Sequence, residues 1–206
     1  MPRLTKAECT QHRAWLSEWR VPAVMAAYVA DVIDAMGSAA FFRQGGVEFL
    51  RDAWLAAEFG QHRRSSFIRL VPACEQWPDF ETRNDEVIER VECVEADLPG
   101  RRRGDEYRVA EESEVNGKHA LEHDPLEDWI ARADQVPAAL AAVAIKKTQK
   151  SYTGCASLLV YLNIGEFGIR QAEIEAAMKP AVATALPHFQ RVWILWKAQL
   201  YGPWTT

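Results

Sequence analysis

The chain has no excess of positive charge: over its 206 residues, 24 Lys and Arg face 29 Asp and Glu, which gives a net charge of −5. A general electrostatic attraction for nucleic acid is therefore excluded, and any contact with a polyanion must use local basic patches. Cysteine is scarce as well. The four cysteines are scattered and form no CxxC pair, so a reduced compartment is expected.

Long apolar runs and targeting signals are also missing. Residues 1–6 lack the apolar core of a signal peptide, and no window reaches the length of a membrane span. We therefore expect a cytoplasmic protein without a membrane partner. No glycine-rich phosphate loop, internal repeat or low-complexity segment is evident, and the 49% hydrophobic and 26% charged residues are ordinary for one globular domain.

An acidic segment, residues 77–97, predicts an unusual β-hairpin. Its second strand carries carboxylates among Val, Cys and Ala residues, although acidic residues are depleted in strands. Alternation places Glu95 and Asp97 on one face with Val91, and Glu92 on the other. Burial of carboxylates is costly unless a cation neutralises them, and rigidly held oxygen ligands suit Mg²⁺ or Mn²⁺.

The pair Pro78-Asp79, followed on the next strand by Glu95-Ala96-Asp97, resembles the motif of the PD-(D/E)xK nuclease superfamily, which has the restriction-endonuclease-like fold. The resemblance implies that Asp79 and Glu95 hold Mg²⁺ or Mn²⁺. It also implies a Lys two residues after Glu95, which activates or positions water. This chain departs from the pattern there, because Asp97 occupies that position.

The same resemblance implies supporting roles for further acids. Asp97 or Glu92 would complete the metal shell or help to orient water. Glu58 would contribute from the helix that precedes the first strand. The alternative for that helix is simple packing on the sheet, without a part in the chemistry.

Hydrophobic periodicity predicts an α/β fold, a mixed β-sheet flanked by helices on both faces, with an antiparallel hairpin at one side and a parallel pair at the other. Residues 1–46 are expected to form an N-terminal helical cap, and residues 47–206 a nuclease-like core. The order of elements in the core agrees with the order that the resemblance implies. The predicted helices are 5–19, 22–36, 47–59, 125–133, 138–150 and 169–185, and the predicted strands are 66–71, 79–83, 87–97, 157–164 and 190–196.

Two basic clusters are candidates for contact with nucleic acid. The first, directly after the acidic strand, is Arg101, Arg102 and Arg103. The second, at the end of the predicted helix 138–150, is Lys146, Lys147 and Lys150. Arginine forks pair well with phosphate, and one of the lysines could replace the missing motif Lys. The alternatives are a solvated loop for the arginines and favourable charge at a helix C-terminus for the lysines.

A histidine pair, His119 and His123, has the i, i+4 spacing that can chelate zinc on a helix. No third ligand is evident nearby. A surface segment without metal is therefore the alternative that we favour for these two residues.

Three functions fit these patterns. The leading prediction is a divalent-metal-dependent nuclease that hydrolyses DNA phosphodiester bonds. The second is a catalytically inactive module of the same fold, acting in binding or assembly, which the missing Lys and the negative net charge favour. The third is a metal-dependent hydrolase of a small phosphorylated substrate. A homodimer or larger complex would agree with cutting of both strands of a duplex.

Overall fold

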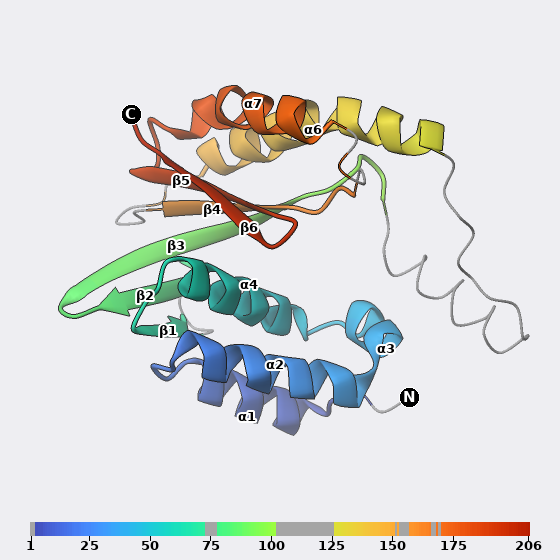
Figure 1. The fold of residues 1–206 in the computed structure, drawn as a ribbon. Helices are drawn as coiled ribbons and strands as arrows, with labels where there is room; N and C mark the ends of the chain where they lie inside the picture. The colour runs from blue at the N-terminus through green and yellow to red at the C-terminus, as the bar shows by residue number, and fades with distance from the viewer. Residues whose placement is uncertain are drawn as a thin grey trace, which may run out of the picture.

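The computed structural model describes residues 3–72, 78–101, 126–150, 152, 157–165, 168 and 170–206. These residues form an α/β fold in which a six-stranded mixed sheet lies between two layers of helices (Figure 1). The helices are α1 (Lys6–Leu16), α2 (Pro22–Met36), α3 (Ser38–Arg43), α4 (Glu48–His62), α6 (Leu126–Thr148), α7 (Gln171–Val182) and the short 3-10 helix η1 (Ala183–Ala185). The strands are β1 (Phe67–Leu70), β2 (Phe80–Asn84), β3 (Val87–Ala96), β4 (Ser157–Leu162), β5 (Arg191–Trp196) and β6 (Gln199–Trp204).

The strands lie in the sheet in their order along the chain, from β1 to β6. Strands β1, β2 and β3 pair antiparallel, β3, β4 and β5 pair parallel, and β6 returns antiparallel to β5. Parallel neighbours need a crossover connection, and α6 and α7 lie in the two crossovers. The predicted mixed sheet, with a hairpin at one side and parallel strands beyond it, is confirmed. The restriction-endonuclease-like fold stays a prediction.

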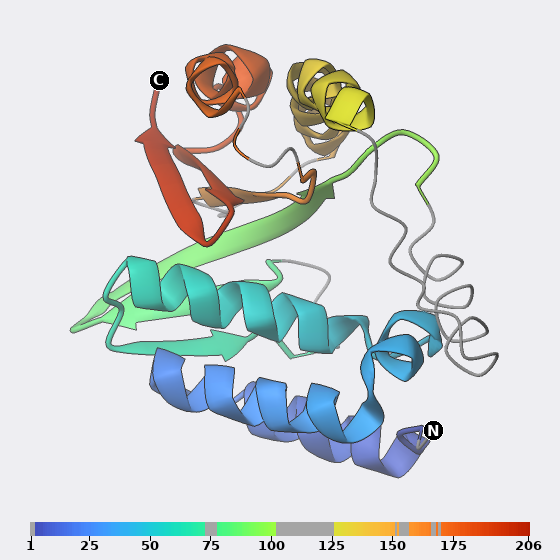
Figure 2. The ribbon, with the colours of Figure 1, turned by 45° about the vertical axis from the view of Figure 1, so that its right-hand side comes forward.

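The sheet separates two apolar cores. Helices α1, α2 and α4 cover one face, and α6 and α7 cover the other (Figure 2). Strand β4 is apolar along most of its length because it serves both cores: Leu159 packs on the α4 side, whereas Leu158 and Val160 pack on the α6 side. Met25 of α2 belongs to the same buried cluster as Leu50 of α4, so the N-terminal helices share a core with the sheet.

The alternation predicted for β3 is confirmed. Cys93 packs in the core on the α4 side, whereas Val94 packs against the core on the α6 side. Glu92 and Glu95 therefore leave the strand on opposite faces. Each of these carboxylates meets a cation from the helix that covers its face, as described below.

Three features differ from the sequence prediction. The N-terminal region contains a fourth helix, α3, that was not predicted. The C-terminal tail, for which no strand was predicted, forms β6 at the edge of the sheet, and a proline is tolerated there because no further strand has to bond to it. The predicted break in the helix near Pro137 is wrong, because α6 runs through this proline. A proline removes one helical hydrogen bond, but Val136 and Leu140 on either side are fully buried, and their packing outweighs that loss.

Gly60 allows α4 to approach its neighbours closely. A Cβ atom there would lie 2.7 Å from Cγ2 of Ile68 and 2.9 Å from Cγ of Pro22. We expect Gly60→Ala to destabilise the fold by about 1–3 kcal/mol, because overpacking forces the surrounding side chains apart. Urea unfolding measures this, with Gly45→Ala as the control, since a Cβ at Gly45 meets nothing within 4 Å. Equal stabilities of the two variants would contradict the prediction.

Candidate active site

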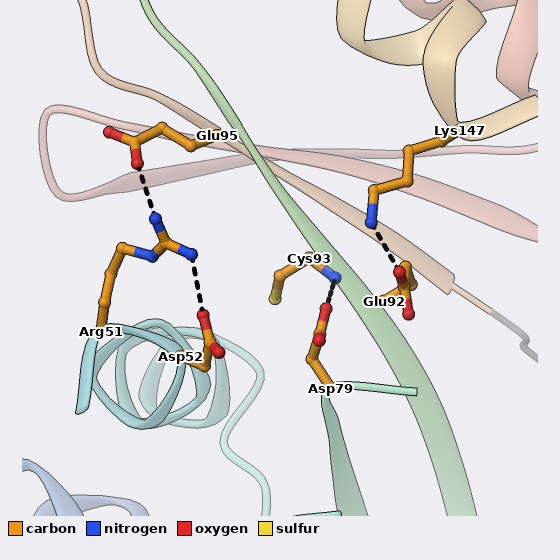
Figure 3. A network of polar contacts seen from close by, with 7 residues as sticks. All are labelled: Arg51, Asp52, Asp79, Glu92, Cys93, Glu95 and Lys147. Carbon is orange, nitrogen blue, oxygen red and sulfur yellow. Dashed lines mark hydrogen bonds and ion pairs between the residues drawn. The ribbon is translucent and has the colours of Figure 1, made fainter. Parts of the chain in front are cut away.

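The candidate site lies where β2 parts from β3. The ladder between these strands ends with Phe80 opposite Val91, whereas β3 continues to Ala96 beside β4. Asp79 stands directly before β2, and its Oδ2 accepts a hydrogen bond of 2.6 Å from the backbone N–H of Cys93 (Figure 3). The carboxylate of Asp79 is therefore fixed against the middle of β3.

A second carboxylate, from Asp52 of α4, faces this position. Burial and the negative charge of Asp79 raise the pKa of Asp52 to about 6, even though the positive charge of Arg51 acts in the opposite direction. The guanidinium of Arg51 donates to Oδ1 of Asp52 at 3.3 Å. A carboxyl that titrates near neutral pH is typical of functional sites, because structural carboxylates are usually neutralised more completely.

Glu92 and Lys147 approach the same position from the α6 side of the sheet. The Nζ atom of Lys147 lies 2.5 Å from Oε1 of Glu92, and both side chains are largely buried. Burial and the charge of Asp79 raise the pKa of Glu92, whereas Lys147 and Lys150 lower it. Burial opposes the charge on Lys147, but the hydrogen bond and charge of Glu92 outweigh it, so the pKa of Lys147 is above its ordinary value. Lys147 is therefore a cation at neutral pH.

Two buried oxygen atoms in this cluster have no hydrogen-bond partner among the described residues. They are Oε2 of Glu92 and the hydroxyl oxygen of Tyr152. The ring of Tyr152 lies 5.6 Å from Nζ of Lys147, and burial raises the pKa of its hydroxyl. Buried polar atoms without partners are uncommon, and they mark a place where a ligand, an ion or water can bind.

Cys93 is not a nucleophile in this arrangement. Burial raises the pKa of its thiol well above the ordinary value, and the charges of Asp79 and Asp52 raise it further. The thiol therefore stays protonated at neutral pH, whereas the thiolate is the reactive form.

Glu95 and Asp97 lie in a separate polar group. The Oε2 of Glu95 accepts from Arg51 at 3.1 Å and its Oε1 accepts from Asn163 at 2.5 Å. Asp97 accepts from the backbone of Leu98 at 2.8 Å and from Arg101 at 3.2 Å. Both acids line a cavity of about 390 Å³ together with Arg51 and Arg101. Arginines therefore already neutralise these two carboxylates.

The residues that were predicted to form one metal site therefore lie in two separate groups. Asp79 points to Cys93 with Asp52 and Glu92 on either side, whereas Glu95 points to Arg51 (Figure 3). Among the predicted lysines, Lys147 reaches the cluster, Lys150 acts on Glu92 through its charge, and Lys146 is exposed.

Other predicted residues lie further away or outside the described chain. Glu58 is half-buried on α4, seven residues after Arg51 and therefore about 10 Å further along the helix axis. The residues that lie outside the described chain are Arg102, Arg103, His119 and His123. In the part of the chain that the structure describes, no group of three His, Cys, Asp or Glu side chains is arranged to hold a metal ion.

Sequence reasoning missed Asp52. A signal was present, because Asp52 follows Phe49 by three residues and precedes Ala56 by four, and both of these residues are buried in α4. A charged residue in the apolar stripe of an amphipathic helix needs a partner or a task.

No protein-family model, no curated protein and no solved structure matches this chain. The function must therefore be argued from the side chains and their geometry. Within the described residues, no helix combines the length and the apolar character needed to cross a bilayer.

Proposed function

We propose that the protein is a divalent-metal-dependent nuclease that hydrolyses DNA phosphodiester bonds, with its site at the junction of β2 and β3. One observation carries the proposal: Asp79 lies close enough to both Asp52 and Glu92, which approach it from opposite faces of the sheet, for its charge to raise their pKa values, and Lys147 pairs with Glu92. The proposal keeps Asp79 from the sequence motif and replaces Glu95 by Glu92 as its partner.

The donor set fits a magnesium or manganese ion. Mg²⁺ is commonly bound through one or two carboxylates, and waters and substrate phosphates complete its shell. Asp79 and Glu92 supply two carboxylates, and Oε2 of Glu92 has no hydrogen-bond partner among the described residues. When bound, such an ion neutralises charge on the phosphate and lowers the pKa of its water.

The remaining residues have roles that follow from their charge. Lys147, protonated at neutral pH, would hold a non-bridging phosphate oxygen and would not act as a base. Asp52, with a pKa of about 6, is largely ionised above neutral pH and is well suited to accept the proton of the attacking water. A base is most effective when its pKa lies near the working pH.

Binding of Mn²⁺ in a calorimeter and Mg²⁺-dependent cleavage of plasmid DNA test this function. We expect one site to bind Mn²⁺, with affinity that rises with pH, because burial and the charge of Asp79 raise the pKa of Glu92 and the metal must compete with the proton on this ligand. Affinity that is independent of pH between about 5 and 8 would contradict the carboxylate site.

A non-catalytic module is the second candidate. The specific observation in its favour is that Lys147 already pairs with Glu92, and that Arg51 pairs with both Asp52 and Glu95. These ion pairs connect the helices to the sheet and can therefore stabilise the fold without a role in catalysis. Folded protein that neither binds Mn²⁺ nor cleaves DNA in Mg²⁺ would support this candidate and exclude the nuclease.

A further inference from the structure

An aromatic pocket lies beside the polar group of Glu95. It has a volume of about 230 Å³ and is lined by Ile33, Phe41, Phe42, Arg51, Trp54 and Tyr161. It shares Phe41, Phe42 and Arg51 with the larger cavity that contains Glu95. The two cavities are therefore neighbours, and the larger one adds the charged side chains of Glu95, Asp97 and Arg101 to the shared aromatic rings.

The walls of the aromatic pocket are suited to a flat ligand. Trp54 and Tyr161 meet edge to face, with ring centres 5.2 Å apart, and Phe41 and Phe42 meet in the same way at 4.8 Å. The four rings are only half-buried by the protein itself. Aromatic faces of this kind bind nucleobases by stacking, with little dependence on which base is present.

The neighbouring cavity can recognise the edge of a base that extends into it, because Glu95 and Arg51 both line that cavity. Glu95 accepts hydrogen bonds from Arg51 and Asn163. A carboxylate has about four acceptor sites, so Glu95 can also accept from the imino or amino group of a base. Asn163 and Arg51 supply donors beside this acceptor.

Arg51 links the pocket to the candidate active site. Its Nη1 donates to Glu95 and its Nη2 donates to Asp52, so the same guanidinium borders both. Glu92 leaves β3 on the opposite face of the sheet, so the link from the pocket to the site runs through Arg51 and Asp52, which lies near Asp79. A base in the pocket would therefore lie on the Asp52 side of a phosphate held at Asp79.

We propose that this pocket binds one nucleobase next to the bond that is cut. The proposal rests on the nuclease function proposed above. A base that enters the pocket must leave the stack of its neighbours, so single strands and frayed ends are preferred to intact duplex. The protein would thus hold its substrate by one unstacked base as well as by phosphates.

The test compares Trp54→Leu with Trp204→Leu, a matched control on β6 that packs against the opposite core. Binding of a fluorescent single-stranded DNA oligonucleotide is measured in EDTA, so that no cleavage is required. We expect Trp54→Leu to weaken binding about 10-fold and Trp204→Leu to leave it unchanged, because stacking on one aromatic ring is lost. Phe41→Leu should act in the same direction, and urea unfolding verifies that each variant is folded.

A second comparison uses oligonucleotides in Mg²⁺ that carry one abasic position, moved along the strand. Cleavage should fall when the missing base adjoins the cut, and at no other position. If cleavage occurs but neither the abasic position nor Trp54→Leu matters, the base pocket is excluded and the nuclease remains. If binding depends on Trp54 but no cleavage occurs, the pocket binds a base, whereas the nuclease and the place of the pocket beside a cut bond are excluded.

Discussion

Asp79→Asn is expected to reduce Mg²⁺-dependent DNA cleavage about 100- to 1000-fold. A metal ion contributes several kcal/mol of charge stabilisation in the transition state, and each ~1.4 kcal/mol corresponds to a factor of 10 in rate. Asparagine keeps an oxygen that can accept the hydrogen bond from Cys93, so the fold should persist. The rate of plasmid cleavage at saturating Mg²⁺ measures the effect, and calorimetry should show that Mn²⁺ binding is lost as well.

Glu92→Gln and Glu95→Gln decide between the two possible partners of Asp79. The cluster geometry predicts a large loss of cleavage for Glu92→Gln and a smaller loss for Glu95→Gln, because Glu95 pairs with Arg51 and Asn163 and lies away from Asp79. Glu173→Gln, on an exposed acid that pairs with Arg170, is the control for loss of negative charge. A loss of cleavage with Glu95→Gln and not with Glu92→Gln would overturn the site and restore Glu95 as the partner of Asp79.

Asp52→Asn is expected to stabilise the fold while it removes activity. The pKa of Asp52 is raised from its ordinary value of 3.8 to about 6. A difference of one in pKa corresponds to ~1.4 kcal/mol, so the ionised carboxylate costs the native state about 2–3 kcal/mol. The folded protein binds the extra proton between these two pKa values, so this group lowers stability as the pH rises from about 4 to about 6.

The pH dependence of unfolding measures this effect. The variant and the natural chain should unfold alike near pH 4, and the variant should be more stable by about 2 kcal/mol above pH 7. Cleavage should fall at the same time, because the proton acceptor is gone. A variant that is less stable than the natural chain above pH 7 would show that Arg51 neutralises Asp52 fully and that the carboxylate is structural.

Much of the fold could be predicted from local pattern. The apolar run of β4 marked a strand buried on both faces, and the acidic alternation of β3 correctly separated Glu92 from Glu95. Helix α6 was harder, because Pro137 is a strong local signal for a break, and only the burial of its neighbours reveals why the helix continues.

The partner of Asp79 could not be fixed without the register of the hairpin. Asn84 pairs with Val87, so Asp85 and Glu86 form a two-residue loop, and this loop aligns Phe80 with Val91. The ladder ends there, and the side chain of the preceding residue, Asp79, accepts from the backbone N–H of Cys93. A sequence motif counts residues along the strand, whereas the loop decides which of them face each other. The periodic pattern of α4 places Asp52 on its apolar face, but only the tertiary packing shows that it lies near Asp79.

Arg51 has a consequence for how the two polar groups communicate. One guanidinium donates to both Asp52 and Glu95. The pKa of Asp52 and the binding of a ligand at Glu95 are therefore thermodynamically linked, and each affects the other by the same free energy. A molecule that draws Arg51 towards Glu95 leaves Asp52 a weaker acid and a better proton acceptor. The ionisation state of Asp52 therefore depends on whether a molecule is bound in the cavity that Glu95 lines.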